Sequence, residues 1–224
     1  MVSACALIAA YNEAQHVSTV ISGTARWVPH VYVVDDGSSD DTSVRAREAG
    51  ATVIRHDRNL GKGCAIRTGL THVLAEPFTH ILFIDGDLQH DPDEIPALLA
   101  MAEQGAGDLV IGERGFDKET MPKPRYYANV IGSWILSRFI GAEVVDSQSG
   151  FRLIRSDLLR RVSLTATGYE IETEMLIKLV RAGATLDRVW VRRLRYAGAR
   201  SKMRPVRDTF RTCMLALKYR YLSN

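Results

Sequence analysis

Short apolar runs and longer amphipathic segments alternate along the first half of the chain. The runs that favour strands cover residues 5–9, 31–34, 52–55, 81–84 and 109–111. The segments between them that favour helices cover residues 12–26, 39–49, 61–74 and 95–103. Strands and helices that alternate in this way predict an α/β fold, a Rossmann-type three-layer sandwich with a mostly parallel central sheet and helices on both faces.

The second half of the chain has a less regular pattern. Helices are expected at residues 124–140, 171–182 and 205–222, and strands at residues 150–154 and 185–195. The sequence contains no repeat or low-complexity segment, and no linker is long enough to separate domains. We therefore expect a single domain over residues 1–224, in which about 116–204 elaborate the sheet built by about 1–115.

The expected strand at residues 81–84 ends in two acidic residues, Asp85 and Asp87. If the backbone stays extended, Asp85, Asp87 and Gln89 point to one side, because side chains alternate along a strand. Three oxygen-bearing side chains at one strand end suit a hard divalent cation such as Mg²⁺ or Mn²⁺. Gly86 leaves room for a ligand to approach the backbone between the acids. Taken by itself, this stretch could equally well be a solvated acidic turn. The neighbouring motifs decide between such a turn and a metal site.

Polar turns also follow the first and second expected strands. Tyr11 and Glu13 come after the first strand, and Asp35 and Asp36 come after the second. In a parallel sheet these residues would meet at the carboxyl ends of the strands, where ligands bind. Carboxylates there can accept hydrogen bonds from ribose hydroxyls or a base N–H, and Tyr11 can pack on a base. Helix capping and turn chemistry is the alternative, and we expect Asn12 to cap the first helix.

Composition and charge narrow the class of protein. The chain is 46% hydrophobic and 25% charged, as in ordinary globular proteins, and its net charge of +3 is too small to indicate a nucleic-acid partner. Its three cysteines are odd in number and lack metal-ligand spacing, which favours a reduced, cytoplasmic protein. No run approaches the roughly 20 apolar residues that span a bilayer, so we expect any membrane contact to be peripheral.

Taken together, the turns resemble those of the inverting nucleotide-sugar glycosyltransferases of family 2, which have the GT-A fold. The matching motifs are Tyr-Asn-Glu at 11–13, Asp-Asp-Gly-Ser at 35–38, Asn-Leu-Gly-Lys-Gly at 59–63, Asp-Gly-Asp-Leu-Gln at 85–89, Gly-Glu-Arg at 112–114, Asp-Ser-Gln-Ser-Gly-Phe-Arg at 146–152 and Ser-Lys at 201–202. Within the family, the chain is most similar to the polyprenol-phosphate (dolichol-phosphate) mannosyl- and glucosyltransferases. The resemblance covers nearly the whole chain, and implies a GT-A-like domain with a nucleotide-sugar and metal half at about 1–115 and an acceptor half at about 116–204.

The resemblance implies a role for each motif. The metal ion, Mg²⁺ or Mn²⁺, would bridge the diphosphate of a UDP- or GDP-linked sugar and would be held by Asp85, Asp87 and Gln89. The donor would be bound by Ala10, Tyr11, Glu13, Asp35, Asp36, Lys62, Asp85, Gly86 and Asp87. The acceptor, expected to be a polyprenyl phosphate, would be bound by Arg114, Arg125, Asn129, Ser149, Arg152 and Lys202. The catalytic candidates are Asp87, Arg114, Asp146, Glu172 and Glu174.

The class of acceptor decides whether a general base is needed. An alcohol needs one, for which Asp146, Glu172 and Glu174 are candidates, whereas a phosphate is already largely ionised at neutral pH. Glu174 has a structural alternative, an ion pair with Lys178 on a solvated helix face. The alternatives for the whole chain are transfer to a hydroxyl of a sugar, lipid or small molecule, and binding of nucleotide sugars without transfer.

We expect His90 at the surface or in a turn.

The expected helix at residues 205–222 is amphipathic. Its apolar side chains fall on one side of a helical wheel, with basic residues along the edges. Apolar residues flanked by long basic ones suit an interfacial helix on an anionic membrane, which would place the protein peripherally on the cytoplasmic membrane face. Packing of the same stripe on the sheet, or a homodimer contact, is the alternative.

Overall fold

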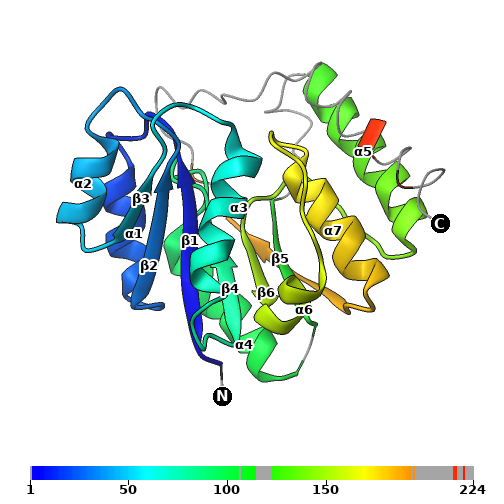
Figure 1. Ribbon diagram of the computed structural model, residues 1–224. Coiled ribbons are helices and arrows are strands. Elements are labelled where there is room, and N and C mark those ends of the chain that lie inside the picture. Colours follow the sequence, from blue (N-terminus) through cyan, green and yellow to red (C-terminus); the bar gives the residue numbers. More distant parts are fainter. Residues whose placement is uncertain are drawn as a thin grey trace.

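The computed structural model describes residues 2–105, 107–114, 123–192, 194, 214–215 and 219, with the side chains of 123–125, 128 and 129 excepted. The described strands form one seven-stranded sheet in the order β3-β2-β1-β4-β6-β5-β7 (Figure 1). Their bounds are β1 (Ala4–Ala10), β2 (His30–Asp35), β3 (Thr52–Arg55), β4 (His80–Phe83), β5 (Leu109–Arg114), β6 (Arg152–Arg155) and β7 (Leu186–Val191). β6 runs antiparallel to both of its neighbours and all other pairs are parallel, which confirms the mostly parallel sheet.

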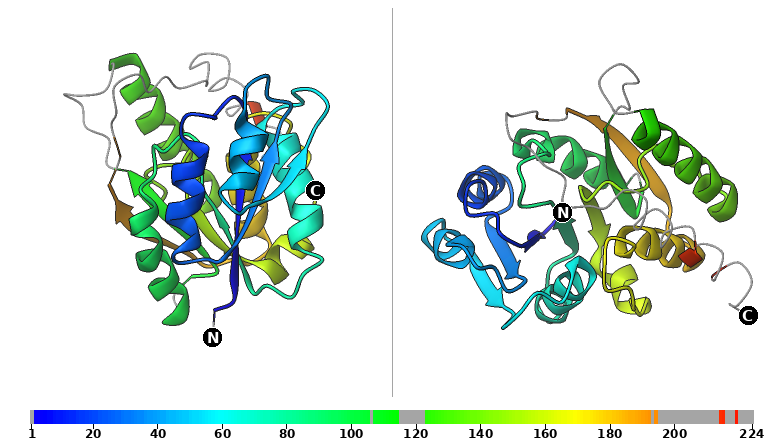
Figure 2. Two further views of the ribbon diagram at one scale, coloured as in Figure 1. Left: turned by 90° about the vertical axis from the view of Figure 1, so that its left-hand side faces the viewer. Right: turned by 90° about the horizontal axis from the view of Figure 1, so that it is seen from above.

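Helices cover both faces of the sheet, as the alternating pattern predicts (Figure 2). One layer is formed by α1 (Val17–Ala25), α2 (Thr42–Glu48) and α4 (Ile95–Glu103), the last preceded by the 3₁₀ turn η1 (Pro92–Glu94). The other layer is formed by α3 (Lys62–Val73), α5 (Lys123–Ile140), α6 (Ser156–Arg161) and α7 (Ile171–Arg181). The fold is therefore a three-layer α/β sandwich.

The central strand β1 is buried on both faces. Its side chains alternate, so that Cys5 and Leu7 pack in the layer of α3 and α7, while Ala6 and Ile8 pack in the layer of α1 and α4. A fully buried Leu or Ile contributes about 1.5–3 kcal/mol relative to an exposed one. Because both faces are covered, the apolar run at residues 5–9 is continuous rather than alternating.

The periodic pattern of apolar residues predicted where the helices and strands lie. Capping residues were a poorer guide to where the helices begin. The structure gives β3 and α4 the predicted bounds, while β5 continues past residue 111 to Arg114 and α6 was not predicted. The prediction that Asn12 caps the first helix is wrong, because α1 begins at Val17. Asn12 has a left-handed φ of 52°, and its Oδ1 accepts the backbone N–H of Ser39 at 2.8 Å. This bond ties the turn after β1 to the turn after β2, and α2 starts at Thr42, after this turn.

The direction of β6 decides which loops meet. The carboxyl ends of β1, β2, β4 and β5 lie along one edge of the sheet, the upper edge in Figure 1. Because β6 runs the other way, the residues that precede it reach this same edge. The motif at residues 146–152 therefore lies beside the end of β5 and the turn that follows β4.

Some predictions concern residues that the structure does not describe. Lys202 and most of the expected helix at 205–222 lie outside the described residues, although Met214, Leu215 and Tyr219 are helical. For Arg125 and Asn129 only the backbone, within α5, is described. In the described part of the chain, no helix is both long enough and apolar enough to cross a membrane.

Candidate active site

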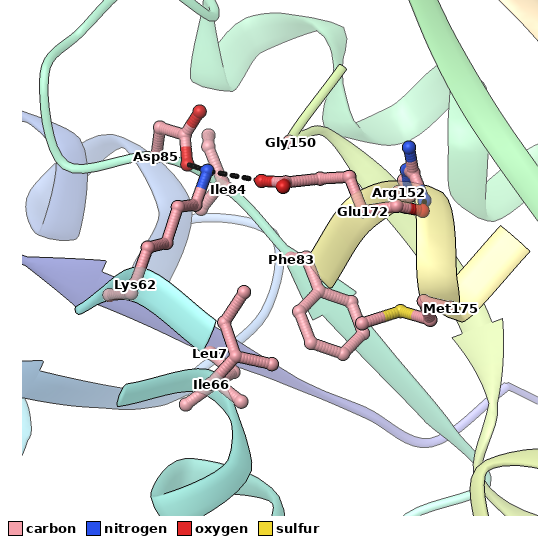
Figure 3. Close-up of a pocket in the computed structure, with 11 residues that line it drawn as sticks. Leu7, Lys62, Ile66, Phe83, Ile84, Asp85, Gly150, Arg152, Glu172 and Met175 are labelled. Carbon is pink, nitrogen blue, oxygen red and sulfur yellow. Dashed lines mark hydrogen bonds and ion pairs between the residues drawn. The ribbon is translucent and has the colours of Figure 1, made fainter. Parts of the chain in front are cut away.

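Three charged side chains from separate elements meet at the carboxyl edge of the sheet. The ammonium of Lys62, the first residue of α3, lies 2.6 Å from Asp85 Oδ1 and 2.5 Å from Glu172 Oε1 (Figure 3). Asp85 lies just past the end of β4, and Glu172 lies in the first turn of α7. The pocket that they line has an apolar floor of Leu7, Phe83 and Met175.

Burial and mutual contact set the charges of these three groups. Burial alone would lower the pKa of Lys62, but Asp85 and Glu172 outweigh burial and raise it, so the lysine is a cation. Burial would raise the pKa of Asp85, but Lys62 outweighs burial and lowers it. For Glu172 the effect of burial prevails over that of Lys62, and its pKa is raised. Glu172 is therefore the carboxyl that more readily takes up a proton.

Gly150 allows the loop before β6 to lie directly against Asp85. A methyl group built at Gly150 would sit 2.5 Å from Asp85 Oδ2, far inside van der Waals contact. The carboxylate is thus held between the backbone of this loop and the Lys62 ammonium. A residue without a side chain is what this close approach requires.

Asp87 and Gln89 lie in a turn rather than in an extended strand. β4 ends at Phe83 and Leu88 has a left-handed φ of 58°, so the predicted alternation of side chains along this stretch is wrong. Gln89 donates from its backbone N to Asp87 Oδ1 at 3.1 Å, and from Nε2 to Asp87 Oδ2 at 2.6 Å. Burial and the charge of Asp85 both raise the pKa of Asp87. The turn, not strand geometry, gathers the two carboxylates and the amide.

Arg114, the last residue of β5, forms a two-point ion pair with Asp146. Its Nε lies 2.7 Å from Asp146 Oδ2, and its second guanidinium nitrogen lies 3.2 Å from Oδ1. Burial would raise the pKa of Asp146, but Arg114 outweighs burial and lowers it. The Arg114 charge also acts on Asp85 and Asp87, where it opposes the effect of burial on their pKa values. Two of the predicted catalytic residues, Arg114 and Asp146, therefore meet beside the turn that carries Asp85 and Asp87.

Glu113 is a residue of this site that sequence reasoning missed. It is fully buried, and its Oε1 accepts the backbone N–H of Val145 at 2.8 Å and that of Asp146 at 3.5 Å. Burial raises its pKa. Glu113 thus holds the backbone that presents Asp146 to Arg114. Glu113 belongs to the Gly-Glu-Arg motif at 112–114, but only the arginine was given a role; the further signal is a single acid within an apolar strand.

Asp35 and Asp36 are buried, and each carboxylate holds a turn in place. Asp35 accepts a backbone N–H within its own turn at 2.9 Å. Asp36 accepts the backbone N–H of Leu60 at 2.9 Å and that of Gly61 at 2.8 Å. Because Lys62 follows directly, Asp36 positions the start of α3 and its lysine. The predicted contact of the two acids with the donor stays a prediction.

Two predicted acceptor residues, Ser149 and Arg152, form hydrogen bonds inside the protein. Ser149 Oγ donates to the carbonyl of Gly112 at 2.6 Å. Arg152 donates to the backbone carbonyls of Ser149 at 2.8 Å, Ser147 at 2.9 Å and Glu172 at 2.7 Å. Arg152 borders the pocket, so its charge acts there while its N–H groups order the loop before β6 and the start of α7.

The structure does not bring Glu174 to the pocket. Its carboxylate accepts the backbone N–H of Thr165 at 2.9 Å and that of Ala166 at 2.7 Å, and pairs with Lys178 at 2.7 Å. Burial would raise its pKa, but these donors outweigh burial and lower it to about 2. The pair with Lys178 is confirmed, but the solvated face is wrong, because Glu174 is fully buried.

His90 was predicted at the surface or in a turn, and the predicted exposure at the surface is wrong. Its ring is fully buried and lies 5.2 Å from that of Phe151, centroid to centroid. Burial, with the charge of Arg114, lowers its pKa to about 3, so the ring is neutral. Within the described residues neither ring nitrogen has a hydrogen-bond partner, and the same holds for one oxygen each of Glu113 and Glu172. Such atoms are rare in folded proteins, and their concentration here is typical of a binding site.

The turn after β1 lies beside the acidic turn after β4, as the parallel sheet predicts. A Cβ built at Gly86 would lie 3.5 Å from Ala10 Cβ and 3.7 Å from Glu13 Cγ, which is ordinary contact. Tyr11, between these two residues, is exposed. The structure thus gathers the predicted donor residues of the two turns at one place.

Comparison with known proteins identifies the family. Residues 5–163, more than half of the chain, match the family described as Glycosyl transferase family 2. Glycosyltransferase AglJ of Haloferax volcanii is 33% identical over 80% of this chain and 59% of its own length. Undecaprenyl-phosphate mannosyltransferase of Micrococcus luteus is 29% identical over 82% of this chain and 80% of its own length.

The fold also has solved counterparts. One is the crystal structure of glucosyl-3-phosphoglycerate synthase from Mycobacterium tuberculosis in complex with Mn²⁺, UDP and glucosyl-3-phosphoglycerate. Its TM-score is 0.74 at 24% identity, over 97% of this chain and 79% of that one, so the likeness concerns the fold. The chain belongs to glycosyl transferase family 2, and it is a glycosyltransferase with the GT-A fold.

Proposed function

We propose that this glycosyltransferase moves a hexose from a UDP- or GDP-linked sugar to a polyprenyl phosphate, with inversion at the anomeric carbon and with a divalent metal ion. The observation that carries the proposal is the convergence of the cations Lys62 and Arg114 with Asp85 and Asp87 at one edge of the sheet. Two cations beside a metal-binding turn suit a reaction in which a diphosphate leaves and a phosphate attacks. Such an acceptor would place the enzyme peripherally at the cytoplasmic face of a membrane.

The metal ion would be held by Asp85, Asp87 and Gln89. Their oxygen atoms are the ligands that Mg²⁺ and Mn²⁺ prefer, and a bound cation would relieve the repulsion by which Asp85 raises the pKa of Asp87. Among the described residues, no three His, Cys, Asp or Glu side chains are grouped to hold a metal ion. Oxygen atoms of the donor diphosphate and of water would therefore complete the ligand shell. When bound, the ion supplies charge neutralisation to the leaving diphosphate.

The residues of the chain bind and orient the two substrates. Lys62 would exchange its contact with Asp85 for a diphosphate oxygen, and Arg114, oriented by Asp146, would bind the acceptor phosphate. An acceptor phosphate oxygen then forms a bond to C1 of the sugar while the bond from C1 to the diphosphate oxygen breaks. The nucleoside diphosphate leaves with the electron pair. No proton moves, because the acceptor phosphate is already ionised at neutral pH.

The names of relatives support the lipid acceptor. Undecaprenyl-phosphate mannosyltransferase of Micrococcus luteus aligns with most of this chain, and its name specifies a polyprenyl phosphate. The structure of the Mycobacterium tuberculosis synthase was solved with Mn²⁺ and UDP, which supports a metal ion and a nucleotide-linked donor here.

A hydroxyl acceptor is the second candidate, and Glu172 favours it. Glu172 lines the pocket, burial raises its pKa, and one of its oxygens has no partner within the described residues. These are properties of a general base that takes a proton from an alcohol. The similar fold from Mycobacterium tuberculosis was solved with a glycosylated small molecule, glucosyl-3-phosphoglycerate.

Two substitutions separate the acceptor classes. Glu172→Gln keeps an oxygen for Lys62 but cannot take a proton, whereas Arg114→Ala removes the phosphate ligand. With polyprenyl phosphate as acceptor, we expect Glu172→Gln to keep most of the rate and Arg114→Ala to lose about 100-fold. Glu48→Gln, on the exposed side of α2, is the control. A severe loss in Glu172→Gln together with a mild one in Arg114→Ala would favour the hydroxyl acceptor.

A further inference from the structure

The outer face of helix α5 exposes a continuous set of large apolar side chains. This outer face of α5 consists of Tyr127, Val130, Ile131, Trp134 and Ile135. Trp134 is 67% exposed and Ile131 is 54% exposed. At the angular step of an α-helix, the positions fall within roughly 140° of the circumference. Single exposed apolar side chains are ordinary, but a contiguous set of this size is typical of an interaction surface.

The inner face of α5 attaches the helix to the domain. Leu136 is buried in the core that α3 and α7 share, and the hydroxyl of Ser133 accepts the backbone N–H of Ser147 at 3.3 Å. The outer face takes no part in this packing. A helix that is apolar on both faces needs a second apolar neighbour.

The charge of α5 indicates an anionic lipid surface as that neighbour. The helix sequence contains Lys123, Arg125 and Arg138, and no Asp or Glu. Arg138 is exposed in the last turn, at an angular position within the outer face. Basic and aromatic residues around an apolar face are typical of helices that lie in a membrane interface. A symmetric contact between two copies of α5 would instead bring like charges together.

The position of α5 places such a surface next to the site. α5 packs beside α7, which carries Glu172, and it is the next helix after β5, which ends at Arg114. Figures 1 and 2 show α5 on the flank of the molecule opposite α1 and α2. A membrane that contacts this flank presents its lipid headgroups on the Arg114 side of the sheet.

We propose that the outer face of α5 docks the enzyme on an anionic membrane surface, with Trp134 and Ile131 in the headgroup region. The proposal rests on the proposed function, because a polyprenyl phosphate acceptor resides in a membrane. It assigns the membrane contact to α5, whereas the sequence pattern favoured residues 205–222.

Co-sedimentation with vesicles tests docking without donor or acceptor. The full chain should bind vesicles of phosphatidylcholine and phosphatidylglycerol, and bind less at raised salt. Ile131→Gln combined with Trp134→Gln should weaken binding by about 10-fold or more. Trp27→Gln is the matched control and should bind like the wild type, because this side chain is 42% exposed and follows directly after α1, which lies on the opposite flank. Unchanged binding of the double variant, or no binding of the wild type at low salt, would overturn the proposal.

The fluorescence of Trp134 identifies what covers the face. Trp27→Phe and Trp190→Phe leave Trp134 as the only tryptophan of the chain. Docking predicts an emission that shifts to the blue only when anionic vesicles are added. A blue-shifted emission without vesicles contradicts docking: in a dimer it assigns the face to a second copy, and in a monomer to another segment of the same chain.

Transfer rates on a soluble and on a membrane-embedded acceptor distinguish the docking proposal from the proposed function. The double variant Ile131→Gln/Trp134→Gln should use a short-chain, water-soluble polyprenyl phosphate normally, but lose about 10-fold in rate when the acceptor is embedded in vesicles. Equal rates of wild type and variant on the embedded acceptor would contradict docking. Failure of the wild type on both acceptors would contradict the proposed function, and the vesicle binding would still decide the docking.

Discussion

The Lys62 ammonium lies 2.6 Å from Asp85 and also contacts Glu172 at 2.5 Å, so that one cation balances two carboxylates, of which Glu172 is buried and Asp85 is partly buried. This contact fixes the start of α3 against the turn after β4 and the first turn of α7. In the proposed reaction, a bound diphosphate would compete with Asp85 for the lysine, which would leave the Asp85 carboxylate available to hold the metal ion. Lys62 would thereby couple donor binding to metal binding.

Lys62→Met removes the cation and leaves the buried Glu172 and the partly buried Asp85 without compensation. We expect transfer to fall by about 100-fold or more, and the free energy of unfolding to fall by about 3–5 kcal/mol. The double variant Lys62→Met/Glu172→Gln should regain part of the stability but not the rate. Initial rates and urea unfolding measure both quantities. A double variant no more stable than the single one would argue against the paired-charge explanation.

Asp87→Asn should leave the fold intact and lower transfer by about 100-fold, because Asn preserves the size of the side chain but not its charge at the metal ion. Circular dichroism checks the fold, and initial rates over a range of Mn²⁺ concentrations check the metal requirement. Asp41→Asn, at the exposed start of α2, is the control. Near-normal rates in Asp87→Asn that still require the metal would indicate that other residues hold the ion.

Glu113 is expected to act on the acceptor through Asp146 and Arg114. Glu113→Val deletes the acceptor of two backbone N–H groups, so Arg114 should lose its fixed orientation. The KM for the acceptor should rise by about 10-fold while the KM for the donor stays unchanged. Glu113→Gln keeps an oxygen for the N–H groups and should behave much like the wild type. Equal losses for donor and acceptor would indicate general disruption of the end of β5.

Glu174 is expected to stabilise the fold without taking part in transfer. Its pKa of about 2 lies below the ordinary value of 4.5, so its contribution is full above pH 4.5 and is lost as the pH falls toward 2. Glu174→Gln should lower the free energy of unfolding by about 1–3 kcal/mol at neutral pH and keep its kcat. Urea unfolding from neutral pH downward should show this difference narrowing below pH 4.5. A difference independent of pH would contradict the assignment.

The edge of the sheet that carries the site could be predicted, because an apolar run followed by a polar turn is a local pattern. The turns after β1 and β4 do meet there, and β3 and α4 have their predicted bounds. Strand direction is not a local property. Nothing in residues 152–155 indicates that β6 runs antiparallel, and that direction is what brings Asp146 and Gly150 to the site.

Roles that depend on tertiary partners could not be predicted. A buried charge looks the same as an exposed one in the sequence. The sequence therefore does not show that Arg152, whose contact with the acceptor stays a prediction, donates to three backbone carbonyls. His90 is buried for a similar reason, since its neighbour Phe151 is far away in the chain. Asn12 has the chemistry of a helix cap but joins two turns, because its partner Ser39 is also remote in sequence.

Transfer from radiolabelled UDP- and GDP-linked hexoses to polyprenyl phosphate, with Mn²⁺ or Mg²⁺ present, tests the proposed function most directly. We expect label in the extracted lipid with one of these donors, loss of that label on addition of EDTA, and its return with excess metal. Label found only on a hydroxyl acceptor would contradict the lipid phosphate acceptor. Lipid labelling that EDTA leaves unchanged would contradict the metal ion, and no labelled product with any donor and acceptor would contradict the proposed transfer itself.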